Sequence, residues 1–138
     1  MSSEAITRND LIAILNEVLP SVAVDYVAEQ GTKDGWKYRK WNSGRIEAWV
    51  SKSVGSIAVT NGGATTYGGY RSNEQTIAIP SGIFTSTPNV IGNKAAFQGA
   101  TIYGLRANST TQISYFLGGC TASATVSSQV INIYAWQD

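Results

Sequence analysis

Residues 35–49 read GWKYRKWNSGRIEAW, and this stretch decides the fold because it predicts a complete β-hairpin. Polar and apolar side chains alternate along 35–41 and again along 45–51, which is typical of strands with two differently exposed faces. The intervening residues 42–44 (NSG) suit a three-residue loop with Gly44 in the left-handed conformation. The sequence therefore predicts two antiparallel strands joined by a short turn.

The loop length determines which side chains lie opposite each other across this hairpin. A three-residue loop produces the cross-strand pairs Lys37/Trp49, Arg39/Glu47 and Trp41/Arg45. One face then carries an ion pair between two cation–aromatic contacts, and a two-residue loop would break this complementarity. The opposite face is expected in the core and consists of Trp36, Tyr38, Ile46, Ala48 and Val50.

Further short strands are expected downstream, separated by turn signals rich in glycine, asparagine and proline. They are residues 56–60, 75–79, 88–92, 100–106, 110–117 and 129–136. Many short strands with such punctuation predict an antiparallel sandwich or barrel, and the absence of an internal repeat argues against a propeller or solenoid. We therefore expect a mainly β protein in which residues 35–138 form an antiparallel β-sandwich.

One short helix is expected upstream of the sandwich. Thr7 is its predicted N-cap, Asp10 completes a capping box at the third helical position, and Pro20 is predicted to end it. A helix from Asp10 to Leu19 spans about 15 Å and is too short to be stable alone in water. It must therefore pack on something.

The apolar side chains of this helix run nearly all the way round it. Leu11, Leu15 and Val18 follow at heptad spacing, and Ile14 is among the residues that widen the stripe. We expect residues 1–20 to serve attachment or oligomerisation, with Leu11, Ile14, Leu15 and Val18 as the contact residues. The alternative is that the helix docks on its own domain. Residues 21–34 are expected to form a linker and the first strand.

Composition excludes several chemistries. The 138 residues include 10 Lys+Arg, 9 Asp+Glu, one cysteine and no histidine. Histidine-dependent nucleophile pairs, imidazole metal ligands, an internal disulfide and a thiolate zinc site are all excluded. Beyond residue 50 the carboxylates are Glu74 and Asp138, so a glycosidase pair is not expected either. We expect no enzyme activity, metal or cofactor.

Charge and hydropathy also bear on partners and location. Nearly balanced charge argues against a nucleic-acid partner, and no apolar run approaches the roughly 20 residues that span a bilayer. The first residues lack the features of a signal peptide, so synthesis in a reducing cytosol is expected. Residues 107–137 carry no formal charge. Their strands are either covered by sister subunits or form a neutral surface sheet.

Binding is more plausible than catalysis, and a long glycine-rich loop from Gly62 to Asn73 is the first candidate. Tyrosine offers a flat face to a sugar ring, and arginine and asparagine add directional hydrogen bonds. The candidate saccharide-binding residues are Tyr67, Tyr70, Arg71, Asn73, Tyr103 and Arg106. Alternatively, the tyrosines pack the loop down and Arg71 is simply solvated. Trp41 and Trp49 fit a structural ladder better than a sugar site, and Cys120 is interpreted as an incidental thiol.

A family resemblance accompanies this interpretation. Residues 25–32 (DYVAEQGT) and 35–49 resemble a segment of bacteriophage and prophage tail-fibre and structural proteins. Residues 77–80, 83–84, 87–90 and 130–135 are similar to the core pattern of carboxy-terminal β-sandwich domains of phage fibres, which are themselves similar to H-type lectins. The resemblance implies a trimeric sandwich on a virion, often at a fibre tip that engages host glycans. It implies no particular ligand-contacting residues.

The expected function is therefore a homotrimeric virion fibre or receptor-binding structural protein with a face for host-surface glycan. The alternative is a head fibre or capsid decoration protein with no ligand, and a third hypothesis is a cell-encoded lectin. Expected partners are two further copies of the chain, another virion protein bound through residues 1–20, and host polysaccharide. Neither nucleic acid nor membrane insertion is expected.

Overall fold

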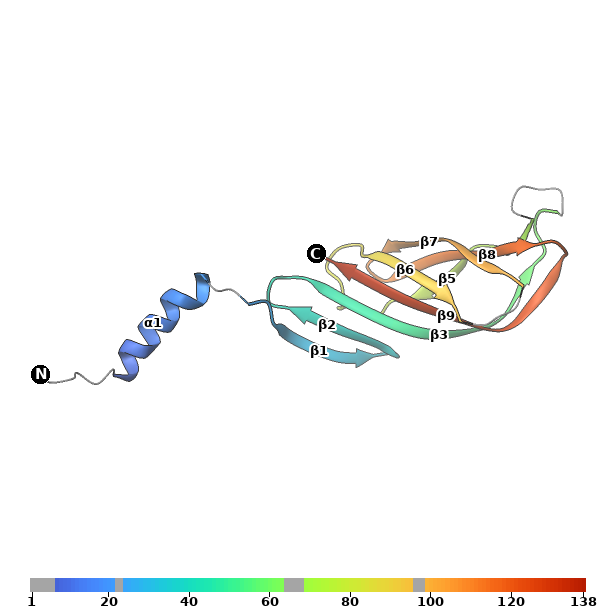
Figure 1. The fold of residues 1–138 in the computed structure, drawn as a ribbon. Helices are drawn as coiled ribbons and strands as arrows, with labels where there is room; N and C mark the ends of the chain where they lie inside the picture. The colour runs from blue at the N-terminus through green and yellow to red at the C-terminus, as the bar shows by residue number, and fades with distance from the viewer. Residues whose placement is uncertain (1–6, 22–23, 64–68, 96–98) are drawn as a thin grey trace, which may run out of the picture.

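The computed structural model describes residues 7–21, 24–63, 69–95 and 99–138, and within them one helix precedes nine strands (Figure 1). The elements are α1 (Arg8–Ser21), β1 (Val27–Lys33), β2 (Trp36–Trp41), β3 (Ile46–Val59), β4 (Tyr70–Arg71), β5 (Gln75–Ala78), β6 (Asn89–Lys94), β7 (Thr101–Ser109), β8 (Gln112–Cys120) and β9 (Ala124–Gln137). The mainly β prediction is confirmed.

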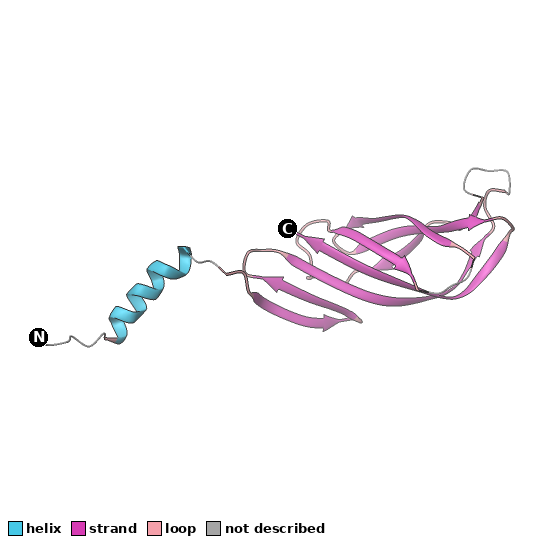
Figure 2. Cartoon of the chain, in the orientation of Figure 1, coloured by secondary structure: helices cyan, strands magenta, loops and turns pink. Residues whose placement is uncertain are grey.

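The strands form two antiparallel sheets that lie over each other as a sandwich (Figure 2). The five-stranded sheet has the order β1-β2-β3-β9-β6. In the four-stranded sheet, β4 and β5 pair with one side of β8 and β7 pairs with the other. All pairings are antiparallel, as the sequence predicts for a chain of short strands and tight turns.

The core lies between the sheets and collects the apolar side chains of alternate strand positions. Ile131, Ile133 and Ala135 enter it from β9, while Ile113 and Leu117 enter it from β8. The alternate positions of the same strands face outward. Each sheet therefore has an outer face on which side chains are available for binding.

The hairpin has the predicted register. Strands β2 and β3 pair Lys37 with Trp49 and Arg39 with Glu47, and the Trp41 N–H donates to the Arg45 carbonyl at 2.8 Å. Gly44 has a φ of 98°, which places it in the left-handed region, and its N–H donates to the Trp41 carbonyl at 3.0 Å. The register predicted from the three-residue turn is therefore confirmed.

The cation–aromatic contacts of the hairpin differ from the prediction. The cation over Trp49 is Arg39, 5.2 Å from the ring centroid, rather than the directly opposite Lys37. Arg45 directs its guanidinium to Glu47 at 3.5 Å instead of to Trp41. Long side chains reach diagonal neighbours across a pair of strands, so the directly opposite residue need not be the partner.

Strand β3 corrects the predicted segmentation. Residues 45–51 and 56–60 were expected as separate strands, but β3 runs continuously from Ile46 to Val59 along β9. The register shifts on either side of Gly55, whose φ is 70°. Such bulges let a strand bend and continue in the same sheet, so glycine here marks an irregularity and not a turn.

The N-terminal capping prediction is confirmed. The Asp10 N–H donates to Thr7 Oγ1 and the Thr7 N–H donates to Asp10 Oδ2, both at 3.1 Å. The hydrogen bonds from Thr7 also lower the pKa of the Asp10 carboxyl. The predicted end was wrong, because α1 continues through Pro20 to Ser21. Proline has a helical φ and removes one hydrogen bond, so the last turn can include it.

Helix α1 lies apart from the two sheets (Figure 1). Leu11, Ile12, Ile14 and Leu15 are each between 43% and 51% exposed, so one chain leaves this apolar surface uncovered. The side chain of Val18, the remaining predicted contact residue, lies outside the described residues. Among the described residues, no helix is both long and apolar enough to span a membrane.

Candidate functional site

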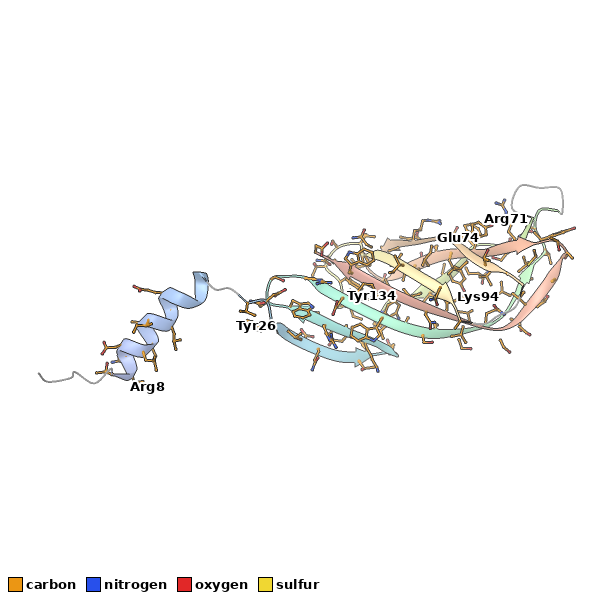
Figure 3. The ribbon with its side chains drawn as sticks, viewed as in Figure 1. Arg8, Tyr26, Arg71, Glu74, Lys94 and Tyr134 are labelled. Carbon is orange, nitrogen blue, oxygen red and sulfur yellow. The ribbon has the colours of Figure 1, made fainter. Side chains whose placement is uncertain are left out.

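Three of the predicted saccharide-binding residues come together on the outer face of the four-stranded sheet. Tyr103 and Arg106 come from β7, and Arg71 comes from β4 on the other side of β8. Figure 3 shows Arg71 and Glu74 on the side of the sandwich formed by β7 and β8. Tyr103 stacks on Phe116 with ring centroids 5.5 Å apart. Phe116 is thus a member of this surface that the sequence interpretation missed.

A bulge in β7 makes this arrangement possible. Tyr103 pairs with Phe116 and Arg106 with Ser114, two residues on the same face of β8, with a register shift between the pairs. Gly104 lies in the shift with a φ of 61°. Strict alternation would have placed Tyr103 and Arg106 on opposite faces.

Three of the predicted binding residues, Tyr70, Asn73 and Arg106, have contacts within the chain. Tyr70 is partly buried and packs against the core. The carboxamide oxygen of Asn73 accepts a hydrogen bond from Asn61 at 2.6 Å, and Arg106 forms a 2.6 Å ion pair with Glu74. Tyr67 lies outside the described residues. This face therefore holds the rings of Tyr103 and Phe116 beside Arg71, while the charge of Arg106 is paired with Glu74.

The outer face of the five-stranded sheet is the better-formed surface, and we call it the Trp49 face. Trp49 of β3, Tyr134 of β9 and Ile91 of β6 are register partners on successive strands, so their side chains lie in one row. Tyr134 stacks with Trp136 at 5.7 Å, and Ile91 is 58% exposed. Figure 3 shows Tyr134 on the side of the sandwich formed by β3 and β9.

Two hollows share Trp49 on this face. The first has a volume of about 410 Å³ and is lined by apolar residues together with Ser51, Asn93 and Asn132. The second has a volume of about 460 Å³ and is polar; its lining includes Gln30, Thr32, Lys37 and Arg39. Both volumes fall within the range of small-ligand sites. No lining residue of the first hollow is charged, whereas the second has two cations.

Glu47 forms a cluster with Arg39, Arg45 and Tyr134 at the centre of this face. The Glu47 side chain is largely buried, and its carboxylate lies 3.6 Å from Arg39 and 3.5 Å from Arg45. The Tyr134 hydroxyl donates to the same carboxylate at 2.8 Å. Burial and this hydrogen bond raise the pKa of Tyr134. Glu47 therefore orients the side chains on both sides of Trp49.

Three tyrosines with raised pKa values, one of them in this cluster, predict alkaline destabilisation. Tyr134, Tyr115 and Tyr38 all have pKa values raised above the ordinary 10.0, so the folded state holds these protons more tightly than the unfolded chain. The contribution of these tyrosines to the free energy of unfolding should be constant below about pH 10 and fall as pH rises above it. Urea unfolding at several pH values above 10 should show a smaller decrease in the free energy of unfolding for Tyr134→Phe than for the wild type. Equal falls in the two proteins would contradict a contribution from Tyr134.

The arrangement of side chains on these two faces is suited to binding. In the described ranges, no group of three or more His, Cys, Asp or Glu side chains could hold a metal ion. Cys120 is buried and its thiol donates to the Gly99 carbonyl, so it has a packing role. What the surface offers is aromatic rings, amides, hydroxyls and two cations.

Comparison with known proteins agrees with the fold. The architecture is that of a two-sheet antiparallel sandwich preceded by one helix. No family model and no curated protein matches the chain. A solved structure of an N-truncated R1-type pyocin tail fibre is similar to it, with a TM-score of 0.57 over 89% of this chain and 95% of that chain. Because the identity is 14%, this similarity shows a common fold.

Proposed function

We propose that this chain is a fibre-type structural subunit of a phage or phage-tail-like particle, and that it is not an enzyme. The observation that carries the proposal is the structural similarity of 89% of this chain to a pyocin tail fibre. The composition supports it, because a chain without histidine and with its buried carboxylate tied to two arginines has no evident acid–base pair. Its place is the virion or a particle resembling a phage tail.

We further propose that the chain acts as a homotrimer attached through its N-terminal segment. The uncovered apolar side chains of α1 support self-association or docking on another particle protein, because isolated short helices gain stability by burying such a surface. Hydrogen bonds also join the segment that follows α1 to the turn between β2 and β3. Asp25 accepts hydrogen bonds from the Ser43 hydroxyl at 2.9 Å and from the Ser43 N–H at 3.2 Å.

Receptor binding is the finer part of the proposal. The sandwich presents two outer faces with aromatic side chains, and rings flanked by hydrogen-bonding groups suit the surface saccharides of a host cell. We therefore propose that the subunit contacts host-surface glycan while its helix holds it on the particle.

Electron microscopy of particles that carry an epitope-tagged copy of the chain tests this function. Label on a tail or head fibre supports it, and label absent from purified particles contradicts it. Deleting residues 1–20 should abolish incorporation, while the surface variant Tyr103→Ala should incorporate normally. Incorporation without any saccharide binding would favour the decoration role over receptor binding.

A further inference from the structure

The Trp49 face combines an apolar site and a cationic site within reach of one ligand. Trp49 lines both hollows, so a molecule that contacts this ring can extend into each of them. The first hollow offers the rings of Trp49 and Tyr134 and the exposed Ile91 side chain. A ligand for this half needs a flat apolar surface and no charge.

The polar groups at the rim of the first hollow indicate what surrounds that apolar surface. Asn132 donates a hydrogen bond to the Asn93 carboxamide oxygen at 3.0 Å, which orients both amides. Ser51 adds a hydroxyl that can donate and accept. Neutral donors and acceptors around an apolar floor match a pyranose ring, whose hydroxyls lie at the edge of a face of C–H groups.

The second hollow carries a positive charge that this face does not neutralise. Arg39, Arg45 and Lys37 lie on the outer surface of the hairpin, and the carboxylate paired with the two arginines is Glu47 alone. Within the described ranges, no carboxylate lies at ion-pair distance from the Lys37 ammonium. With Glu47 shared between two arginines and Asp138 acting on Arg45, Lys37 and Arg39 leave a net positive charge at the second hollow, which favours an anionic ligand group there.

We propose that the Trp49 face binds an acidic saccharide, with a pyranose ring in the apolar hollow and its carboxylate or phosphate substituent at Lys37 and Arg39. This inference rests on the proposed receptor-binding function and names both the face and the class of glycan. Glu47 acts as a positioning residue, because it holds Arg39 beside Trp49. The site lies on the opposite side of the sandwich from Tyr103 and Arg71.

The test uses the full chain and an immobilised panel of neutral, uronate-bearing and phosphorylated oligosaccharides. The wild type should bind acidic members more tightly than neutral ones, and rising salt should weaken that binding. Lys37→Glu and Trp49→Ala should each raise the Kd by about tenfold or more. Lys52→Glu is the matched charge-reversal control and should bind as the wild type does. Tyr103→Ala tests the rival face of the four-stranded sheet, and binding is retained in it if the ligand lies on the Trp49 face. The uronate and phosphate arms identify the acidic group.

Several results would overturn the inference. Equal binding of neutral and acidic oligosaccharides with no effect of Lys37→Glu would do so, even if Trp49→Ala failed to fold. Loss of binding in Tyr103→Ala with retention in Lys37→Glu would move the site to the other sheet and leave receptor binding intact. Dissociation of the oligomer by Trp49→Ala would identify this face as a subunit interface. A wild type that binds no saccharide would overturn receptor binding as well, while the particle location stays with electron microscopy.

Discussion

Replacing Trp36 with alanine is expected to lower the free energy of unfolding by about 3–5 kcal/mol. Trp36 begins β2 in the five-stranded sheet, is 1% exposed, and donates its indole N–H to the Ala78 carbonyl of β5 at 3.1 Å. The substitution opens a cavity and leaves that carbonyl without its partner. It also removes a direct link between the two sheets. Urea unfolding followed by far-UV circular dichroism measures the loss.

Trp49→Ala is the matched control for this prediction. Trp49 lies on the outer face and is only partly buried, so its truncation removes less apolar surface from the folded state. We expect a smaller loss, of about 1–2 kcal/mol. Similar losses for the two variants would contradict the assignment of Trp36 to the core and of Trp49 to the surface.

Glu47→Ala is expected to cost about 1–3 kcal/mol. The Glu47 residue is 9% exposed and its carboxylate is the common partner of Arg39, Arg45 and the Tyr134 hydroxyl. Removing it leaves two guanidinium groups close together and a tyrosine hydroxyl without its acceptor. Chemical unfolding should show the loss, and Glu47→Gln should restore part of it because the amide oxygen can still accept from Tyr134.

The control is the Arg106–Glu74 ion pair, whose charged atoms lie closer together than those of the Glu47 cluster but whose carboxylate side chain is more exposed to solvent. Arg106 and Glu74 are 2.6 Å apart, but their side chains are 50% and 41% exposed. Solvent screens such pairs, so Glu74→Ala should cost less than about 1 kcal/mol. If Glu74→Ala destabilised the protein as much as Glu47→Ala, the Glu47 cluster could not be the stabilising feature of the outer face.

The hairpin could be predicted from the sequence because its determinants are local. Residues 42–44 select a loop length, and the loop length sets the Arg39/Glu47 pair within the same short segment. The same holds for the Thr7 and Asp10 cap. The sandwich class followed from the spacing of strands and turns, which needs no knowledge of which strands are neighbours.

The Trp49 face could not be predicted because it depends on pairing between distant strands. Alternation places Trp49 and Tyr134 at outward positions of their own strands, but only the pairing of β3 with β9 brings them side by side. Ile91 joins them through the pairing of β6 with β9. Pairing between strands so far apart in the chain depends on the whole fold, and no short sequence pattern encodes which strands become neighbours.

The predicted saccharide-binding residues do not all lie on one face of the sandwich, because the side-chain directions depend on details of strand geometry. Tyr70 and Arg71 are consecutive in β4, so one of the two must point inward, and it is Tyr70 that packs against the core. In contrast, Tyr103 and Arg106 share a face only because of the bulge at Gly104. An isolated glycine in the sequence can indicate a bulge of this kind, but it does not show to which face of the sheet the following side chains point.

The mass of the intact chain in solution, measured by multi-angle light scattering at micromolar concentration, tests the account most directly. A fibre-type subunit whose apolar helix is covered by its own copies should have three times the 14.7 kDa mass of the chain. Deletion of residues 1–20 should reduce the number of copies in the assembly if α1 supplies the contact between them. A stable monomer across that concentration range would contradict the proposal that the chain functions as an assembled fibre.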